Sequence, residues 1–97
     1  MAGRAIISRE AAETLAIQAL TFLANQPERL ARFLAVTGIG PDSLRKAARE
    51  PLFLAGVLDH LATDELLLKE FAAEAEIDPL AIGDARAALA LRKGDKS

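Results

Sequence analysis

Residues Gly38 to Pro41, with the basic side chains that follow them, have the types and spacing best suited to a binding function. Glycines on either side of an apolar residue can expose backbone amides at the start of a helix, where unpaired N–H groups attract phosphate. Arg45, Lys46 and Arg49 could supply positive charge for such a contact. The candidate phosphate or nucleic-acid contacts are Gly38, Ile39, Gly40, Arg45, Lys46 and Arg49.

This Gly-Ile-Gly-Pro turn resembles the hairpin of helix-hairpin-helix DNA-binding motifs, and the resemblance implies weak nucleic-acid binding that does not depend on base sequence. Asp42 departs from that motif, because it places a negative charge near the expected phosphate. A structural interpretation, which we favour, makes Gly38 the end of one helix, Ile39 a core residue and Gly40 the entry to the next helix. A helix-turn-helix interpretation leaves only a short recognition helix before Pro51.

The titratable residues give no catalytic or metal-binding arrangement. His60 is the single histidine, and Asp59 beside it points about 100° away on a helix, so it cannot orient the imidazole. No suitably placed nucleophile accompanies this histidine. Glu70 and Glu74 share a helix face, but the pattern of a calcium-binding loop or of a Glu-x-x-His pair is missing. We therefore expect no catalytic residue, metal ligand or cofactor.

The two segments that follow Pro51 and Asp64 contain more large apolar residues than a small core easily covers. If the surplus forms one exposed patch, it predicts a partner surface or a homodimer. The alternative is that short helices bury all of these side chains. The candidate patch consists of Leu52, Leu54, Leu66 and Leu68.

Helix start and stop signals divide the chain into six short helices. Ser8 can cap the first helix, which should end near Asn25, and Gly38 can take the left-handed conformation that ends the second. No stretch alternates at a period of two, so no strand is expected. The further helices should begin at Pro27, Pro41, Pro51, Thr63 or Asp64, and Asp78-Pro79. Since the links are short, the prediction is a compact all-α domain whose helices pack at steep angles.

Length and composition limit the class of protein. The chain has 97 residues, a net charge of −2 and no cysteine, which suits one domain without disulfides. No apolar run reaches the roughly 18–20 residues of a membrane span, so we expect a cytoplasmic protein. Residues 28–50 are richer in basic residues, and residues 59–84 are richer in acidic ones. Residues 1–7 and 93–97 should fray at either end of the domain, which otherwise spans residues 1–97.

The order of these segments resembles a bacterial family of small helical proteins of unknown function. The resemblance spans roughly Thr14 to Leu89 and implies a one-domain, all-helical protein without assigning an activity. It is carried by Pro27 to Leu30, Arg32 to Leu34, Thr37 to Pro41, Leu44-Arg45, Pro51, Phe53-Leu54, Val57 to Asp59, Asp64-Glu65, Leu67-Leu68, Phe71-Ala72 and Ala85 to Leu89.

Two functional hypotheses follow. The first is a non-enzymatic protein-interaction module or homodimer, based on the apolar residues after Pro51 and on the acidic part of the chain. The second is weak nucleic-acid binding through the Gly38–Pro41 turn and its basic neighbours.

Overall fold

A computed structural model describes residues 7–90, and within them the fold is entirely helical. The elements are α1 (Arg9–Ala24), α2 (Pro27–Thr37), the 3-10 turn η1 (Pro41–Ser43), α3 (Leu44–Ala47), α4 (Pro51–Ala62), α5 (Glu65–Ala75) and α6 (Pro79–Ala90). The prediction of six short helices is confirmed. The predicted fraying concerns residues 1–7 and 93–97, which lie outside the described residues except for Ile7. Ile7 packs, half-buried, against the core.

The helix boundaries follow from local chemistry. The Ser8 hydroxyl accepts a hydrogen bond from the Ala11 N–H at 3.0 Å, and an Asp64 carboxylate oxygen accepts one from the Leu67 N–H at 3.1 Å. Each of these contacts satisfies an amide that the first turn of a helix leaves unpaired. Proline begins α2, α4 and α6, where its missing N–H costs no helical hydrogen bond.

Two helices end in the left-handed conformation. Gly38 has φ 77° after α2, as its position predicts, and its N–H donates to the Leu34 carbonyl at 2.8 Å. Glu76 has φ 58° after α5, although it is not a glycine. The next N–H, that of Ile77, donates to the Ala72 carbonyl at 2.9 Å, and the half-buried Ile77 side chain packs against the core. This pair of contacts holds Glu76 in an unfavourable conformation.

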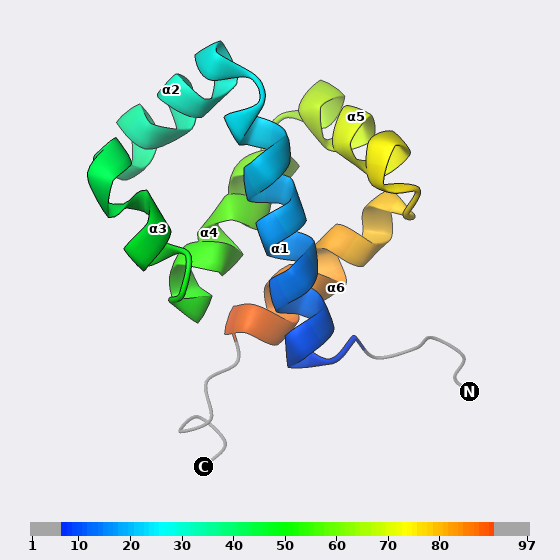
Figure 1. Ribbon diagram of the computed structural model, residues 1–97. Helices are drawn as coiled ribbons and strands as arrows, with labels where there is room; N and C mark the ends of the chain where they lie inside the picture. The colour runs from blue at the N-terminus through cyan, green and yellow to red at the C-terminus, as the bar shows by residue number, and fades with distance from the viewer. Residues whose placement is uncertain (1–6, 91–97) are drawn as a thin grey trace, which may run out of the picture.

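The core lies where α1, α4 and α6 pack directly against one another (Figure 1). Helix α4 is a central helix of this core, with contacts to α1, α5 and α6, and α1 is another, with contacts to α2, α4, α5 and α6. Leu54 is only 2% exposed, so its inclusion in an exposed patch was wrong: it lies on the core side of α4. Ile82 of α6, which the sequence analysis did not assign to the core, is 1% exposed. The fully buried larger side chains are Phe33, Leu23, Leu58, Leu61, Ile82, Leu89 and Val57.

Residues 27–47, which form α2, η1 and α3, make an arm on the side of α1 opposite to α5 (Figure 1). Within this arm Phe33 is the single fully buried side chain. Its ring lies edge-on to two rings of α4, with centroid distances of 5.7 Å to Phe53 and 5.1 Å to His60. Aromatic pairs at these distances attract beyond simple burial. Phe33 is therefore the main anchor of the arm on α4.

No helix among residues 7–90 is long and apolar enough to cross a membrane.

Candidate functional site

The Gly38–Pro41 turn is a helix corner whose amides are partly used within the chain. The Gly38 N–H bonds to the Leu34 carbonyl, and the Ile39 N–H donates to the Thr37 hydroxyl oxygen at 3.3 Å. Ile39 is half-buried, and the helix that follows the turn is a 3-10 turn of three residues leading into four residues of α3. Two of the amides that a phosphate would need are therefore engaged, and the short helix that follows adds little dipole.

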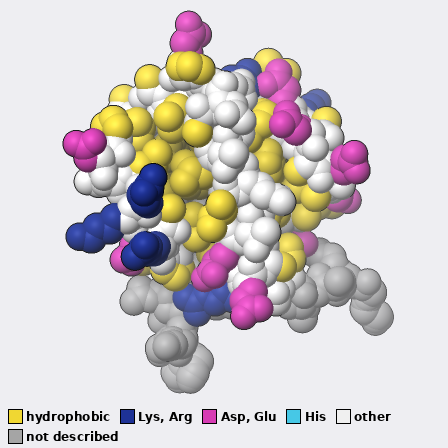
Figure 2. Space-filling view, in the orientation of Figure 1, with side chains coloured by type: hydrophobic (Ala, Val, Ile, Leu, Met, Phe, Trp, Pro, Cys, Tyr) yellow, Lys and Arg dark blue, Asp and Glu magenta, His cyan; other side chains and the backbone are white. Residues whose placement is uncertain are grey.

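The predicted basic residues gather at the end of the arm. Arg45, Lys46 and Arg49 are exposed, and none of them forms an ion pair with any residue between 7 and 90. Figure 2 shows Lys and Arg side chains over α3, beside apolar side chains that lie between α3 and α1. The structure thus brings the three cations together at one corner.

The predicted apolar patch does not form a single surface. Leu54 is buried and Leu68 is half-buried against the core, whereas Leu52 and Leu66 are 56% and 60% exposed. Leu52 lies in the first turn of α4, and Leu66 lies in the first turn of α5, beyond the other end of α4. The intervening length of α4, about 15 Å at 1.5 Å per residue, separates them. The remaining exposed large apolar residues are Ile17, Val36 and Leu80.

A groove of about 410 Å³ lies between α2 and α4, and we call it the α2–α4 groove. Val36, at its edge, is 70% exposed. Gly56 forms part of its floor, and a Cβ placed there would meet no atom within 4 Å. The groove is lined by Arg32, Phe33, Val36, Thr37, Gly56, Asp59, His60 and Thr63.

The charges of the α2–α4 groove are mostly balanced locally. Asp59 accepts a hydrogen bond from Arg86 of α6 at 2.6 Å, so its charge is already paired. Arg32 is exposed and forms no ion pair within the described part of the chain. After these pairings, Arg32 remains without an ion pair to a described residue, and so does Glu28, the carboxylate one turn earlier on α2.

His60 lies in the wall of this groove with its ring against Phe33. Burial, which disfavours the charged imidazolium, is the main cause that lowers the pKa of His60 from 6.5. The negative charge of Asp64 opposes this shift, and the positive charge of Arg32 adds to it. At neutral pH His60 is therefore mainly an uncharged aromatic neighbour of Phe33. The two hydroxyl groups in the lining, those of Thr37 and Thr63, donate to the Leu34 and His60 carbonyls of their own helices.

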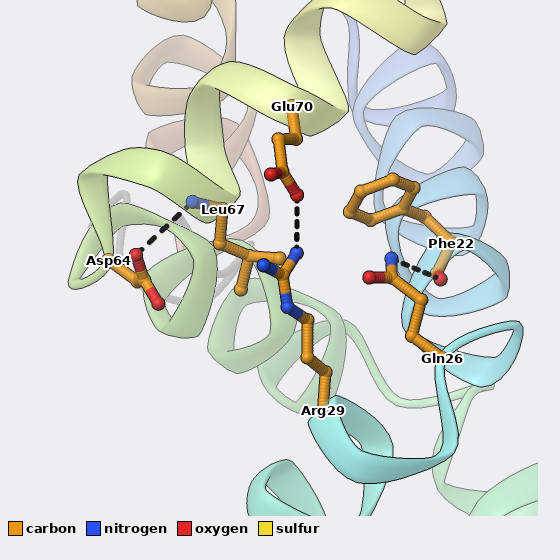
Figure 3. Close-up of polar contacts among 6 residues, drawn as sticks. All are labelled: Phe22, Gln26, Arg29, Asp64, Leu67 and Glu70. Atoms are coloured by element: carbon orange, nitrogen blue, oxygen red, sulfur yellow. Dashed lines mark hydrogen bonds and ion pairs between the residues drawn. The ribbon is translucent and has the colours of Figure 1, made fainter.

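The same groove continues toward α5, where a smaller hollow of about 260 Å³ shares Arg32 and His60 with it. Here Arg29 of α2 donates to a Glu70 carboxylate oxygen of α5 at 2.6 Å (Figure 3). Both side chains are partly exposed, at 31% and 43%. The pair links the base of the arm to α5 and engages the carboxylate of Glu70, which shares a helix face with Glu74. No group of three metal-ligating side chains lies together among residues 7–90.

A second groove, of about 420 Å³, lies between α1 and α5. Its floor contains the ring pair Phe22–Phe71, at a centroid distance of 5.4 Å, and Ile17 stands 46% exposed at its edge. The rim is formed mainly by neutral amide and hydroxyl groups, with Glu74 as its charged member.

Sequence reasoning missed the α2–α4 groove because its two walls are far apart in the chain. A signal was present on each helix: Arg32 and Val36 are four residues apart, as are Gly56 and His60, so each pair shares a helix face. That those two faces oppose each other follows only from the way Phe33 docks the arm on α4.

The comparisons with known proteins assign no activity to the chain. No curated protein and no solved structure matches the chain. A family model described as "Protein of unknown function (DUF3572)" matches residues 9–92, which is nearly the whole chain. The expected resemblance to a family of unknown function is thereby confirmed, and the chain belongs to the DUF3572 family.

Proposed function

We propose that this protein is a non-enzymatic interaction module of the cytoplasm that binds another protein, or a second copy of itself, through the α2–α4 groove. The observation that carries the proposal is the exposure of Val36, at 70%, on the edge of a 410 Å³ groove with an apolar floor. A large aliphatic side chain in that position gains most when a partner covers it, because burial of apolar surface contributes about 25 cal/mol per Å².

Gly56 and Gly83 provide a matched pair of variants for testing this proposal. Both are helical glycines at which an added Cβ meets no atom within 4 Å, but only Gly56 lines the groove. Gly56→Leu should fill the groove, and Gly83→Leu should place the same side chain on α6. Both variants should fold, since leucine favours a helix more than glycine by roughly 0.8 kcal/mol.

The test compares the wild type with both variants. Light scattering coupled to size exclusion reports self-association, and immobilised protein with quantitative mass spectrometry reports retained proteins. We expect an interaction that survives Gly83→Leu and is lost in Gly56→Leu. Identical self-association and identical retained proteins in all three samples would contradict the assignment of the groove as the binding surface.

Weak nucleic-acid binding is the second candidate, favoured by the three exposed cations Arg45, Lys46 and Arg49, which lack ion pairs to described residues. Such binding would be electrostatic and would weaken steeply with salt. Adding duplex DNA at low salt should then shift the amide NMR signals of residues 38–49. The charge-neutral variant Lys46→Gln should reduce the shifts, and absence of any shift at low salt would rule the candidate out.

A further inference from the structure

The arm formed by residues 27–47 carries little of the hydrophobic core. Among residues 7–90, Phe33 is its one buried side chain, and every other buried apolar side chain lies in α1, α4, α5 or α6, which we call the body. Leu30, Leu34 and Leu44 add half-buried contacts to the core. Because α1, α4 and α6 pack directly against one another, the body keeps most of its core when the arm moves away.

Polar contacts between the arm and the body are equally sparse. Within the described residues, the Arg29–Glu70 pair is the one side-chain hydrogen bond or ion pair that joins them. The Thr37 hydroxyl donates to the Leu34 carbonyl, inside the arm itself. Partly exposed ion pairs add little to stability, so the closed arm depends mainly on the apolar contacts of Phe33 and its leucine neighbours.

Both ends of the arm are points where the helical backbone is interrupted. Gln26, with φ −128° and ψ 88°, separates α1 from α2, and Glu50, with φ −95° and ψ 123°, separates α3 from α4. Each precedes a proline, which disfavours helical geometry at the residue before it. The arm can therefore leave without breaking a helix of the body. Once detached, α2 has only eleven residues, fewer than the roughly 12–15 that an isolated helix needs in water, so the free arm should unfold.

His60 lies between the arm and the rest of the molecule. The charged groups that line the two hollows beside it are Glu28, Arg29 and Arg32 of the arm, and Asp59 and Asp64 beyond it. Burial has the largest effect on the pKa of His60 and lowers it, Asp64 raises it, and Arg32 lowers it. Arg32 leaves with the arm, and so does Phe33, whose ring centroid is 5.1 Å from that of His60, whereas Asp64 stays beside the imidazole. The pKa should consequently be higher when the arm is open, so protons favour the open form.

We infer that the arm is a hinged lid: it detaches from α1 and α4 and unfolds as one unit while the body stays folded, and protonation of His60 favours the open form. Opening removes Arg32, Phe33 and Val36 from the α2–α4 groove, so the groove exists only while the lid is closed. The half-buried Phe53 and the His60 ring become accessible on α4. The lid goes beyond the proposed function and does not depend on it, because it is a property of the free chain.

Native-state hydrogen exchange of the full chain, followed by NMR at increasing urea below the unfolding transition, tests the lid. After correction for intrinsic rates, the amides of α2 and α3 should share one opening. It should be at least about tenfold more populated than the opening that exposes the most protected amides of α1 and α4. This opening should depend on urea, since a detached arm exposes new surface, but less steeply than global unfolding does.

Two phenylalanine variants distinguish the lid from the body. Phe33→Leu should populate the opening of the arm about five- to thirtyfold more, because it loses part of the aromatic contact with α4. Phe71→Leu makes the same change in the body, where Phe71 pairs with Phe22. It should make global unfolding easier and leave the opening of the arm unchanged, because Phe71 stays packed when the lid opens.

The coupling to His60 is tested by pH. Between about pH 7 and about pH 5.5, the opening of the arm should become more populated in the wild type and change less in His60→Gln. The comparison uses the change with pH within each protein, so any effect of the substitution on the closed form at neutral pH cancels.

Three results would overturn the inference. Arm amides that exchange only together with α1 and α4 would show that the arm does not open by itself. Exchange without urea dependence would show fluctuations of single residues in place of a detaching unit. The same pH effect in the wild type and His60→Gln would show that His60 does not control the lid. None of these results bears on the proposed function, whose test is the effect of Gly56→Leu on the interactions of the whole protein.

Discussion

Gly38 and Gly40 stand two residues apart at the corner between α2 and η1, yet their backbones make different demands. Gly38 has φ 77°, where a Cβ is strained, whereas Gly40 has φ −78° and ψ 155°, which any residue can adopt. An added Cβ meets nothing within 4 Å at either position. The corner therefore requires glycine at residue 38 for conformational reasons and does not require it at residue 40.

This difference predicts opposite effects of alanine. Gly38→Ala should lower the free energy of unfolding by about 1 kcal/mol. The strain of a left-handed alanine in the folded protein outweighs the stabilisation that alanine brings by reducing the conformational entropy of the unfolded chain. Gly40→Ala should raise it by about 0.4–1 kcal/mol, since only the entropic effect on the unfolded chain applies. Urea unfolding of both variants beside the wild type measures the difference. Equal effects of the two substitutions would contradict the conformation assigned to Gly38.

His60 predicts a dependence of stability on pH. Burial is the main cause that places the pKa of His60 in the folded protein below 6.5. At pH values between that lowered pKa and 6.5, the unfolded chain therefore binds more protons than the folded protein does. Its contribution to stability is therefore complete above pH 6.5 and is lost as the pH falls through that interval. Urea unfolding at about pH 7 and about pH 5.5 should show a loss that is smaller in His60→Gln. The same loss in both proteins would assign the pH dependence to other groups.

At the scale of elements, the arm formed by α2, η1 and α3 is held by one fully buried aromatic side chain, together with Leu30, Leu34 and Leu44, which pack half-buried against the core. Phe33 is fully buried against Phe53 and His60, whereas the Arg29–Glu70 ion pair at the base of the arm is partly exposed. Partly exposed ion pairs contribute about 0–1 kcal/mol, and truncation of a buried phenylalanine costs about 3–5 kcal/mol. The aromatic contact thus contributes more to the attachment of the arm than the ion pair does.

We therefore expect Phe33→Ala to lower the free energy of unfolding by about 3–5 kcal/mol and to speed amide hydrogen exchange most strongly in α2 and α3. Exchange in α1 and α6 should change less, because their mutual packing does not involve this side chain. Val36→Ala on the same helix is the control. Since Val36 is 70% exposed, its loss should change stability by no more than about 0.5 kcal/mol.

At the scale of the whole molecule, stability resides in the packing of α1, α4 and α6. Leu58 of α4 is completely buried, whereas Leu80 at the start of α6 is 74% exposed. A domain of this size has a total stability of about 5–15 kcal/mol, so a single core cavity removes a large share of it. Leu58 and Leu80 therefore allow a fully buried leucine to be compared with a largely exposed one.

Leu58→Ala should consequently lower the free energy of unfolding by about 2–5 kcal/mol and reduce hydrogen-exchange protection in every helix, unlike the local effect expected for Phe33→Ala. Leu80→Ala should lie within about 0.5 kcal/mol of the wild type. Thermal unfolding followed by circular dichroism, together with exchange measurements, checks both. A loss of protection confined to α4 would show that the three helices do not unfold together.

The helices and their ends follow largely from sequence, because their causes are local. Ser8, Gly38 and the prolines at residues 27, 51 and 79 act on backbone groups within a turn of themselves, so their effects can be recognised without tertiary structure. The left-handed Glu76 was not predictable in this way. It is held by the hydrogen bond from Ile77 to Ala72 together with the packing of Ile77 against the core, and the packing lies outside the local pattern.

The candidate surfaces were predicted less well than the helices. The sequence identified the basic residues of α3, but the excess of leucines after Pro51 could not show which of them face inward. Leu54 belongs to the buried core, while Leu52, two residues earlier on the same helix, is exposed. When a helix is apolar on nearly all sides, its periodicity no longer identifies the buried face, and its neighbours decide it.

By itself, then, the sequence determined an all-helical chain with corners at known residues, because capping, proline geometry and apolar spacing act over a few residues. The tertiary structure alone decided that Val36 and Arg32 face Gly56 and His60. That juxtaposition depends on how Phe33 docks the arm on α4, a contact between residues at least twenty positions apart. Local chemistry fixes where helices begin and end, whereas the surfaces between them depend on which helices meet.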